Sequence, residues 1–245
     1  MTGPGIYLAN TVAMWTALVP GARILPGHLE AERPRSTRVV LRDRAAAPAL
    51  NSRLATLAPD RILQVEDVFG VLYPPPGSRS TRMPVMDRPI SPGISNKSDL
   101  SVKADLSVKA VDTPAELEFA ERIMVDGFPL PAHQPLVPGR TLPPHVLTTP
   151  GFRVWRSGEG AAAYTFDDGA AVGLYWLATL PEHRSKGLAR RLLTTAIAAH
   201  PDRVFTLVAT PEGRPLYESL GFTEVATATW HTRPPKNQPV LRNAG

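Results

Sequence analysis

A short basic loop around residue 187 combines residue types that can bind a phosphate group. Arg184, Lys186 and Gly187 stand between an apolar run that ends at Pro181 and an amphipathic segment that follows from Leu188. The first N–H groups of a helix have no partner within the helix and lie at the positive end of its dipole, so they can hold an anion. A glycine lets a phosphate approach the main chain, and an arginine can donate paired hydrogen bonds to it. The pattern indicates either an anion site or a solvated helix cap.

The elements that must position this loop follow from hydrophobic periodicity and turn residues. A capping box with proline at the first helical position predicts a helix that starts after Thr113. Downstream, the pattern predicts three strands, a helix, a strand, a short helix and final strands, over residues 152–156, 161–166, 171–180, 187–200, 203–210, 213–220 and 222–232. Asp-Asp-Gly at residues 167–169 is typical of a hairpin turn. The loop at residue 187 therefore connects a strand to a helix.

Two motifs in this region resemble those of the GCN5-related N-acetyltransferase (GNAT) superfamily. Arg184-x-x-Gly187-x-Ala189 resembles its Arg/Gln-x-x-Gly-x-Gly/Ala signature, and residues 216–222 resemble its second recurring stretch, a helix that ends in Leu-Gly-Phe. The resemblance covers the C-terminal part of the chain. It implies an α/β (α+β) fold with a mixed, mostly antiparallel central sheet flanked by helices, here with an additional N-terminal α/β lobe.

The resemblance also implies that acetyl-CoA is a co-substrate and that coenzyme A binds beside this strand and helix. The pantetheine arm would hydrogen-bond to main-chain groups of Leu177 and Thr179, which polarise the thioester. The pyrophosphate would lie over the helix start, with Arg184 and Arg190 as charged partners. The residues expected to form this phosphate site are Arg184, Ser185, Lys186, Gly187, Leu188, Ala189 and Arg190.

Tyr217 matches the tyrosine that protonates the leaving thiolate in much of the superfamily. A phenol with a pKa of about 10 suits a thiol leaving group of similar basicity. The alternative interpretation is a core tyrosine. Thr210 stands where many members have asparagine, and a hydroxyl replaces only one hydrogen bond of an amide. Arg214 is then a substitute phosphate ligand.

The acceptor side is less defined by the sequence. The proline-rich segment 128–144, which begins with Phe128, is either a substrate-facing loop or a surface connection. Tyr175 and Trp176 lie in the strand beside the acetyl site, and strand alternation would turn one of them towards the acceptor unless both belong to the core. The sequence does not identify the general base. The candidates are an ordered water chain and four residues: Glu182, His133, Asp126 and His231.

Four segments are expected along the chain. The pattern of residues 1–89 predicts helices over 6–18 and 45–57 and strands over 38–41 and 61–65, which indicates an N-terminal α/β lobe. This lobe is a degenerate GNAT-like copy, a lid or a dimerisation domain. Residues 90–104 form a linker, where the hexapeptide Asp-Leu-Ser-Val-Lys-Ala occurs at 99–104 and again at 105–110. Residues 105–235 form the catalytic domain, and residues 236–245 form a tail. The second hexapeptide predicts the first strand of the catalytic domain.

Composition restricts the function classes. The chain has 245 residues, no cysteine and a formal net charge of +5. The absence of cysteine excludes disulfides and an acyl-cysteine intermediate, and no metal is expected. The positive charge suits a polyanionic cofactor better than nucleic acid, since it is spread along the chain.

The start has no basic leader, and no apolar run is long enough to span a membrane, so a cytoplasmic location is expected. The frequent Pro, Ala and Arg residues are typical of GC-rich bacteria.

These observations predict an N-acetyltransferase that moves an acetyl group from acetyl-CoA directly to a primary amine of a small molecule, an antibiotic or a peptide terminus. The protein would be a monomer or a homodimer. A non-catalytic module that binds acyl-CoA and regulates or scaffolds a partner is the alternative. A nucleic-acid-binding protein is a third class, which would show strong, salt-dependent affinity.

Overall fold

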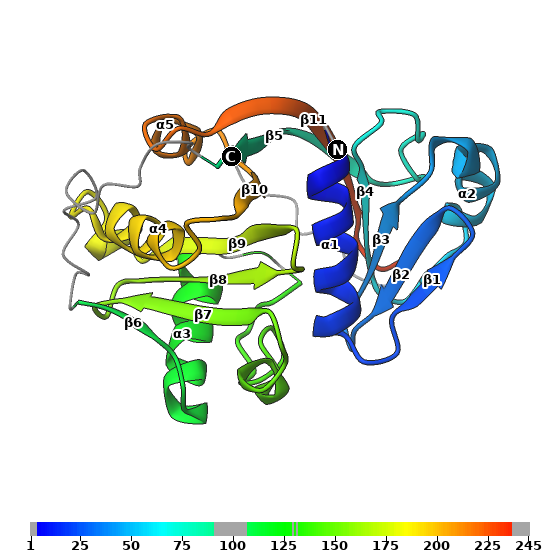
Figure 1. Ribbon diagram of the computed structural model, residues 1–245. Coiled ribbons are helices and arrows are strands. Elements are labelled where there is room, and N and C mark those ends of the chain that lie inside the picture. The colour runs from blue at the N-terminus through cyan, green and yellow to red at the C-terminus, as the bar shows by residue number, and fades with distance from the viewer. Residues whose placement is uncertain (1–3, 91–106, 129, 131, 237–245) are drawn as a thin grey trace, which may run out of the picture. The chain divides into compact units, whose positions relative to one another are not determined.

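The computed structural model describes residues 4–90, 107–128, 130 and 132–236 (Figure 1). The chain divides into two compact units that are not contiguous in sequence. Unit 1 comprises Met1–Leu18 and Val85–Val225, and unit 2 comprises Val19–Pro84 and Ala226–Gly245. No helix among the described residues is both long enough and apolar enough to cross a membrane.

Unit 1 contains one sheet with strand order β5-β10-β9-β8-β7-β6. Its neighbours are antiparallel except β9 and β10, which are parallel. Its helices are α1 (Gly5–Leu18), α3 (Pro114–Gly127), α4 (Leu188–Ala198) and α5 (Arg214–Glu218), with single 3-10 turns at Pro144–Leu147 and Pro181–His183. Its strands are β6 (Val108–Ala110), β7 (Phe152–Ser157), β8 (Ala161–Asp167), β9 (Ala171–Thr179), β10 (Val204–Val208) and the last residues of β5 (Arg79–Arg88).

Side chains alternate between the two faces of the sheet in unit 1, and helices cover both faces. Phe205 and Leu207 of β10 pack with Leu192 and Leu193 of α4 in one apolar core. Helix α4 lies in front of the sheet in Figure 1, and α3 passes behind β7, β8 and β9. The helix α4 is amphipathic because its apolar residues recur at helical spacing, so one side is buried and the other is solvated.

Unit 2 contains the strand order β1-β2-β3-β4-β11. Here too the neighbours are antiparallel with one parallel pair, β3 and β4. The elements are β1 (Arg23–Leu25), β2 (His28–Glu32), β3 (Ser36–Leu41), the turn Arg44–Ala46, α2 (Ala47–Leu54), β4 (Ile62–Asp67) and most of β11 (Thr223–Arg233). Its core lies between β3, β4 and α2 and includes Val39, Leu50 and Leu63.

One connectivity therefore occurs twice along the chain. An antiparallel meander leads into a helix and then into a strand parallel to the last meander strand, as β1-β2-β3-α2-β4 and as β7-β8-β9-α4-β10. The strand that follows each copy pairs with the other copy: β5 pairs with β10, and β11 pairs with β4. This repeat has the topology that a degenerate copy in the N-terminal half would have, and the exchange of strands explains why each unit is assembled from two chain segments.

The units differ from the predicted lobes 1–89 and 105–235 at both ends. The predicted helix over residues 6–18 exists as α1, but it belongs to unit 1, where Asn10 Nδ2 donates to the carbonyls of Phe166 and Ala171 (3.1 Å each). Residues 226–236 belong instead to unit 2. Hydrophobic periodicity predicts a helix but not the sheet against which that helix packs. The sequence therefore could not place the boundary between the two units. The linker beyond residue 90, the first hexapeptide, and the tail beyond residue 236 lie outside the described residues.

Candidate functional site

The parallel strands β9 and β10 separate part of the way along their length. Their register pairs Ala171, Val172 and Gly173 with Val204, Phe205 and Thr206. Beyond Gly173, β9 continues to Thr179 and pairs only with β8 among the described residues. The edge of β9 that faces the gap therefore carries main-chain N–H and C=O groups available to a ligand.

Leu177 and Thr179 direct their main-chain groups into this fork. The N–H of Leu180 donates to Gly160 O on the β8 side (2.9 Å). Because the main-chain groups of successive residues point to alternate edges of a strand, those of Thr179 and Leu177 point away from β8. Arg184 Nε already donates to the Thr179 carbonyl (3.3 Å), so the guanidinium reaches back from the loop to the end of β9.

The loop after β9 leaves a helix start open to solvent. Gly187 is the N-cap of α4 with φ of 74°, no side chain caps the helix, and the first turn contains no acidic residue. A Cβ on Gly187 would have only Arg191 Nη1 within 4 Å, at 3.7 Å. Ser185 also has a positive φ, 60°. These features favour an anion at the free N–H groups of Leu188, Ala189 and Arg190.

Some of the predicted phosphate ligands are exposed near the helix start, and others already have polar partners within the protein. Ser185, Lys186 and Arg184 are exposed before the start of α4, and their role as phosphate ligands stays a prediction. Arg190 donates to Ser219 Oγ (2.8 Å). Arg214 forms ion pairs with Glu218 (2.7 Å) and Glu224 (3.0 Å), so its charge is already balanced. Thr210 Oγ1 accepts a hydrogen bond from the N–H of Gly213 (3.2 Å) and so supports the turn into α5.

Tyr217 lies in the apolar core on the α4 side of the sheet. Its ring contacts Phe222 at 5.8 Å between centroids, and Leu177 of β9 packs against the same core. Gly213 makes room for it, because a Cβ there would lie 3.0 Å from Tyr217 Cε2. Burial raises the pKa of the Tyr217 phenol, which keeps it protonated and able to donate. Its position agrees with the core interpretation, and the role as an acid stays a prediction.

A β-bulge turns Tyr175 and Trp176 to the same face. The β8–β9 register shifts between Ala162 and Tyr164, and Trp176 has φ of 54°. Tyr175 Oη donates to Asn10 Oδ1 of α1 (2.7 Å), and the Trp176 ring meets His133 edge-on at 4.6 Å. The alternation on which the prediction for these two residues depends is broken by the extra residue, and their role towards the acceptor stays a prediction.

The segment 128–144 is held over this face by a buried carboxylate. Glu121 of α3 accepts hydrogen bonds from the N–H groups of Gly139 (2.6 Å), Thr141 (2.5 Å) and Leu142 (3.0 Å). The Thr141 hydroxyl lies 2.9 Å from His133 Nδ1. The described residues of the segment thus form a wall beside Trp176.

Phe128 contributes to this wall at the end of α3. Its ring lies 6.2 Å from that of Trp176. Gly127 permits the approach of α3 to β9, since a Cβ there would lie 3.1 Å from Ala178 Cβ. Phe128, His133 and Trp176 therefore form an aromatic cluster beside β9, which is the candidate acceptor face.

The four candidates for a general base differ in setting. Glu182 and Asp126 are exposed. His133 belongs to the aromatic wall described above. His231 belongs to unit 2, where its Nδ1 lies 2.8 Å from Ser80 Oγ. Burial lowers the pKa of His231, although the charge of Asp67 opposes this shift. Among the described residues, no group of His, Asp and Glu side chains has the arrangement of a metal site.

Unit 2 has the same order of strands and helix as unit 1, but its described residues form neither a strand fork nor an uncapped start of the helical segment. Its parallel strands β3 and β4 stay paired over five positions, from Ser36 and Ile62 to Val40 and Glu66. The 3-10 turn Arg44–Ala46 leads directly into α2, and the side chain of its N-cap Asp43 accepts a hydrogen bond from the Ala45 N–H (2.9 Å). Among the described residues of unit 2, the paired strands and the capped turn thus differ from the fork and the uncapped helix start of unit 1.

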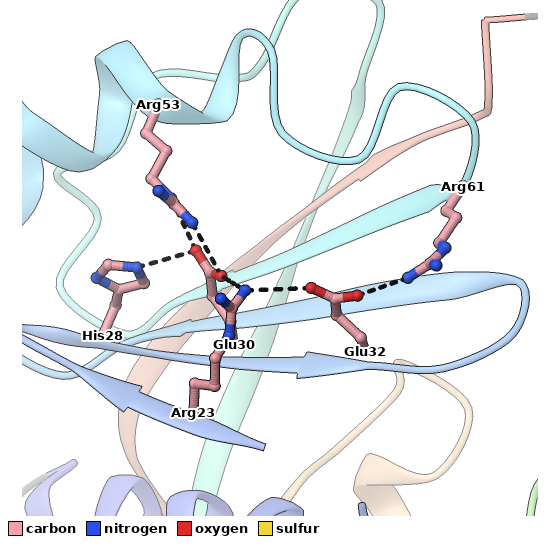
Figure 2. Close-up of polar contacts among 6 residues, drawn as sticks. All are labelled: Arg23, His28, Glu30, Glu32, Arg53 and Arg61. Atoms are coloured by element: carbon pink, nitrogen blue, oxygen red, sulfur yellow. Dashed lines mark hydrogen bonds and ion pairs between the residues drawn. The ribbon is translucent and has the colours of Figure 1, made fainter. Parts of the chain in front are cut away.

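Unit 2 contains instead a cluster of ion pairs between β1, β2 and α2 (Figure 2). The buried Glu30 carboxylate bonds Arg53 (2.8 and 3.1 Å), Arg23 (2.7 Å) and His28 (3.2 Å). The exposed Glu32 pairs with Arg23 and Arg61. Each carboxylate in the cluster is paired with arginine, so we interpret it as a structural network.

We predict that Glu30→Gln lowers the free energy of unfolding at pH 7 by about 1–3 kcal/mol, as expected for hydrogen bonds to a buried charged group. Burial alone would raise the pKa of Glu30, but the bonds from Arg53 and His28 and the charges of Arg53 and Arg23 lower it below its ordinary value. The charged form is therefore stabilising above the ordinary glutamate pKa of about 4.3, and that stability is lost as the pH falls through the folded-state pKa. Urea unfolding at pH 7 and at stepwise lower pH measures this.

Glu32→Gln is the matched control, since the Glu32 side chain is 50% exposed and surface pairs contribute about 0–1 kcal/mol. Equal effects of the two substitutions, or an effect of Glu30→Gln that does not shrink in acid, would contradict the assigned role of Glu30.

The comparisons with known proteins agree with this geometry. Residues 151–224 match the family model of the acetyltransferase (GNAT) domain. The chain is similar in structure to a GCN5-related N-acetyltransferase from Kribbella flavida, with a TM-score of 0.60, 19% identity and coverage of 96% of both chains. A GNAT-family structure from Novosphingobium aromaticivorans matches with a TM-score of 0.59 and 16% identity, over 93% of this chain and 95% of that chain. These identities establish a shared fold, and no curated protein matches the sequence.

Proposed function

We propose, from the premise that residues 151–224 are an acetyltransferase domain of the GNAT family, that the protein transfers an acetyl group from acetyl-CoA to a primary amine. The acceptor is a small molecule, an antibiotic or a peptide terminus. The observation that carries the proposal is the fork between β9 and β10, which opens beside the uncapped, glycine-started helix α4.

The chemical groups of the proposed donor match these two features of the site. Coenzyme A has an extended amide-containing arm and a pyrophosphate, and it requires a strand edge next to an anion site. The main-chain groups of Leu177 and Thr179 serve the arm, and the N–H groups that follow Gly187 serve the pyrophosphate. Lys186 and Arg184 supply positive charge there. A side chain at residue 187 would fill the cradle, which is why the glycine matters.

The same geometry supports direct transfer. A neutral amine on the acceptor face attacks the thioester carbonyl, while main-chain donors of β9 stabilise the developing oxyanion. The C–S bond then breaks, and Tyr217, kept protonated by burial, gives its proton to the thiolate. The amine nitrogen then loses a proton, which restores the Tyr217 hydroxyl directly or through water, so the products are an amide and free coenzyme A.

The acceptor face favours an amine with an apolar or aromatic part. Trp176, Phe128 and His133 present ring surfaces next to the fork, and Phe128 is 38% exposed. Large flat side chains bind apolar groups through buried area and ring contacts. We therefore place 2-phenylethylamine and a short peptide with a free amino terminus in the first acceptor panel.

Release of free thiol from acetyl-CoA, with and without each amine, tests the proposal. Turnover that depends on an amine, together with a product heavier by one acetyl group in mass spectrometry, is the expected result. Acetyl-CoA binding without turnover for any amine would favour the alternative, a non-catalytic module that binds acyl-CoA and regulates or scaffolds a partner.

A further inference from the structure

Three residues from three neighbouring strands form a row at the point where the fork opens. Thr206 of β10 is paired with Gly173 of β9 on one side and with Asp87 of β5 on the other. Residues directly opposite each other in neighbouring strands point to the same face. Phe205 and Leu207, the neighbours of Thr206, pack under α4, so the row lies on the opposite face.

That opposite face is the acceptor face. A Cβ on Gly173 would collide with Asn10 Oδ1 (2.0 Å) and with Tyr175 Oη (2.6 Å), so these two polar groups stand directly over the row. Tyr175 neighbours Trp176 in the bulge. Asp87 thus shares a face of unit 1 with the aromatic wall and lies one strand away from the end of the β9–β10 pairing.

The Asp87 carboxylate is buried but incompletely partnered. Asp87 is 8% exposed, and its Oδ1 accepts a hydrogen bond from Thr206 Oγ1 (2.6 Å). Within the described residues this is the one side-chain bond recorded for the carboxylate. Burial raises the pKa of Asp87, and the Thr206 bond partly lowers it. A carboxylate in this state binds a proton more readily than a solvated one.

Among the described residues, Asp87 forms no ion pair, and its side-chain hydrogen-bond partner is the hydroxyl of Thr206 on β10. Asn10 on α1 and Tyr175 on β9 place an amide and a hydroxyl over the neighbouring Gly173, and the Thr223 hydroxyl at the start of β11 lies 3.5 Å from the Asp87 carbonyl. The next residue along β5, Arg88, donates instead to the Leu220 carbonyl (3.0 Å).

We propose that Asp87 is the general base of the acetyl transfer and accepts a proton from the ammonium form of the acceptor. The inference rests on the proposed function and names a residue for the step that function leaves open. The ammonium N–H bond breaks and its proton passes to a carboxylate oxygen, directly or through one water. The nitrogen lone pair then forms the C–N bond as the C–S bond breaks. The thiolate takes a proton from Tyr217, and the second proton lost by the nitrogen restores the Tyr217 hydroxyl. Asp87 returns the proton to solvent after product release.

This assignment gives the segments that flank the first copy of the repeat a role in the chemistry of the second. Asp87 lies on β5, which follows the first copy in the chain, and Asn10 lies on α1 before it. Both belong to unit 1 together with the fork. The active site of the second copy is therefore complete only with residues supplied by the N-terminal half.

The test compares wild type, Asp87→Asn and the control Asp202→Asn, an exposed aspartate paired with Arg203, in acetyl transfer to the best amine of the panel. Asp87→Asn retains a group that accepts the Thr206 bond. We expect kcat/KM to fall about 100-fold at pH 7, with acetyl-CoA affinity by calorimetry unchanged. Activity of the wild type should fall in acid as Asp87 is protonated, and this limb should vanish in Asp87→Asn.

Thr206→Val provides a second measurement that does not remove the carboxylate. Loss of the hydrogen bond should raise the pKa of Asp87 further and move the acid limb to higher pH, a change that a purely structural Asp87 would not produce. Wild-type kcat/KM in Asp87→Asn, or an unmoved acid limb in Thr206→Val, would overturn the inference. Absence of wild-type turnover with every amine would instead contradict the proposed function.

Discussion

Replacing Gly187 by aspartate is expected to weaken acetyl-CoA binding by at least about 100-fold. The substitution puts a carboxylate over the free N–H groups at the start of α4, where the pyrophosphate is proposed to lie, and like charges in contact cost several kcal/mol. A factor of 100 corresponds to about 2.8 kcal/mol. Calorimetric titration of the wild type and the variant with acetyl-CoA measures the change.

The chain offers a matched control for this experiment. Gly158, in the turn between β7 and β8, also has a positive φ (56°) and open space where a Cβ would stand. Gly158→Asp introduces the same residue in the same left-handed conformation on the β7–β8 turn, outside the start of α4. Near wild-type affinity in Gly158→Asp with loss in Gly187→Asp supports the site, whereas equal affinity in both variants would place the pyrophosphate elsewhere.

Tyr217→Phe is expected to lower kcat about 100-fold while leaving acetyl-CoA affinity unchanged. The phenylalanine keeps the ring contact with Phe222 and the fit against Gly213, so only the proton donor is removed. Since burial raises the pKa of Tyr217, the phenol stays protonated across the neutral range, and no loss of wild-type activity from its ionisation is expected there.

Tyr164→Phe controls for loss of a buried hydroxyl as such. Tyr164 is also buried in unit 1, and its Oη lies 3.8 Å from Met14 Sδ. Steady-state kinetics and calorimetry on both variants distinguish a catalytic role of the Tyr217 hydroxyl from a purely structural one. Unchanged kcat in Tyr217→Phe would leave Tyr217 as a core residue only, and a drop of equal size in Tyr164→Phe would trace the effect to packing.

The sequence predicted the parts of this site that depend on local pattern. The strand before Pro181, the helix after Gly187 and the short helix with Tyr217 were all identified, because each has its own periodicity and glycine or proline boundaries. The β-bulge at Trp176 was missed, since a positive φ at tryptophan leaves no signal in the sequence.

Long-range placement could not be derived in the same way. Asp87 follows Val85 and Met86 in a segment that reads as the end of an N-terminal lobe, and only the exchange of β5 brings it to Thr206. Glu121 gives no sign in the sequence that it holds three main-chain N–H groups of a distant loop. The strand exchange that defines both units depends on pairing between segments more than 100 residues apart.

The stoichiometry of acetyl-CoA binding to the wild-type chain tests the account most directly. The connectivity occurs twice, but among the described residues the parallel strands separate in the second copy alone, and the helix of the first copy follows a 3-10 turn that is capped by Asp43. Calorimetric titration should therefore give one acetyl-CoA bound per chain. Absence of binding by the folded protein would contradict the proposed cofactor site, and two bound molecules per chain would contradict the conclusion that the first copy is closed.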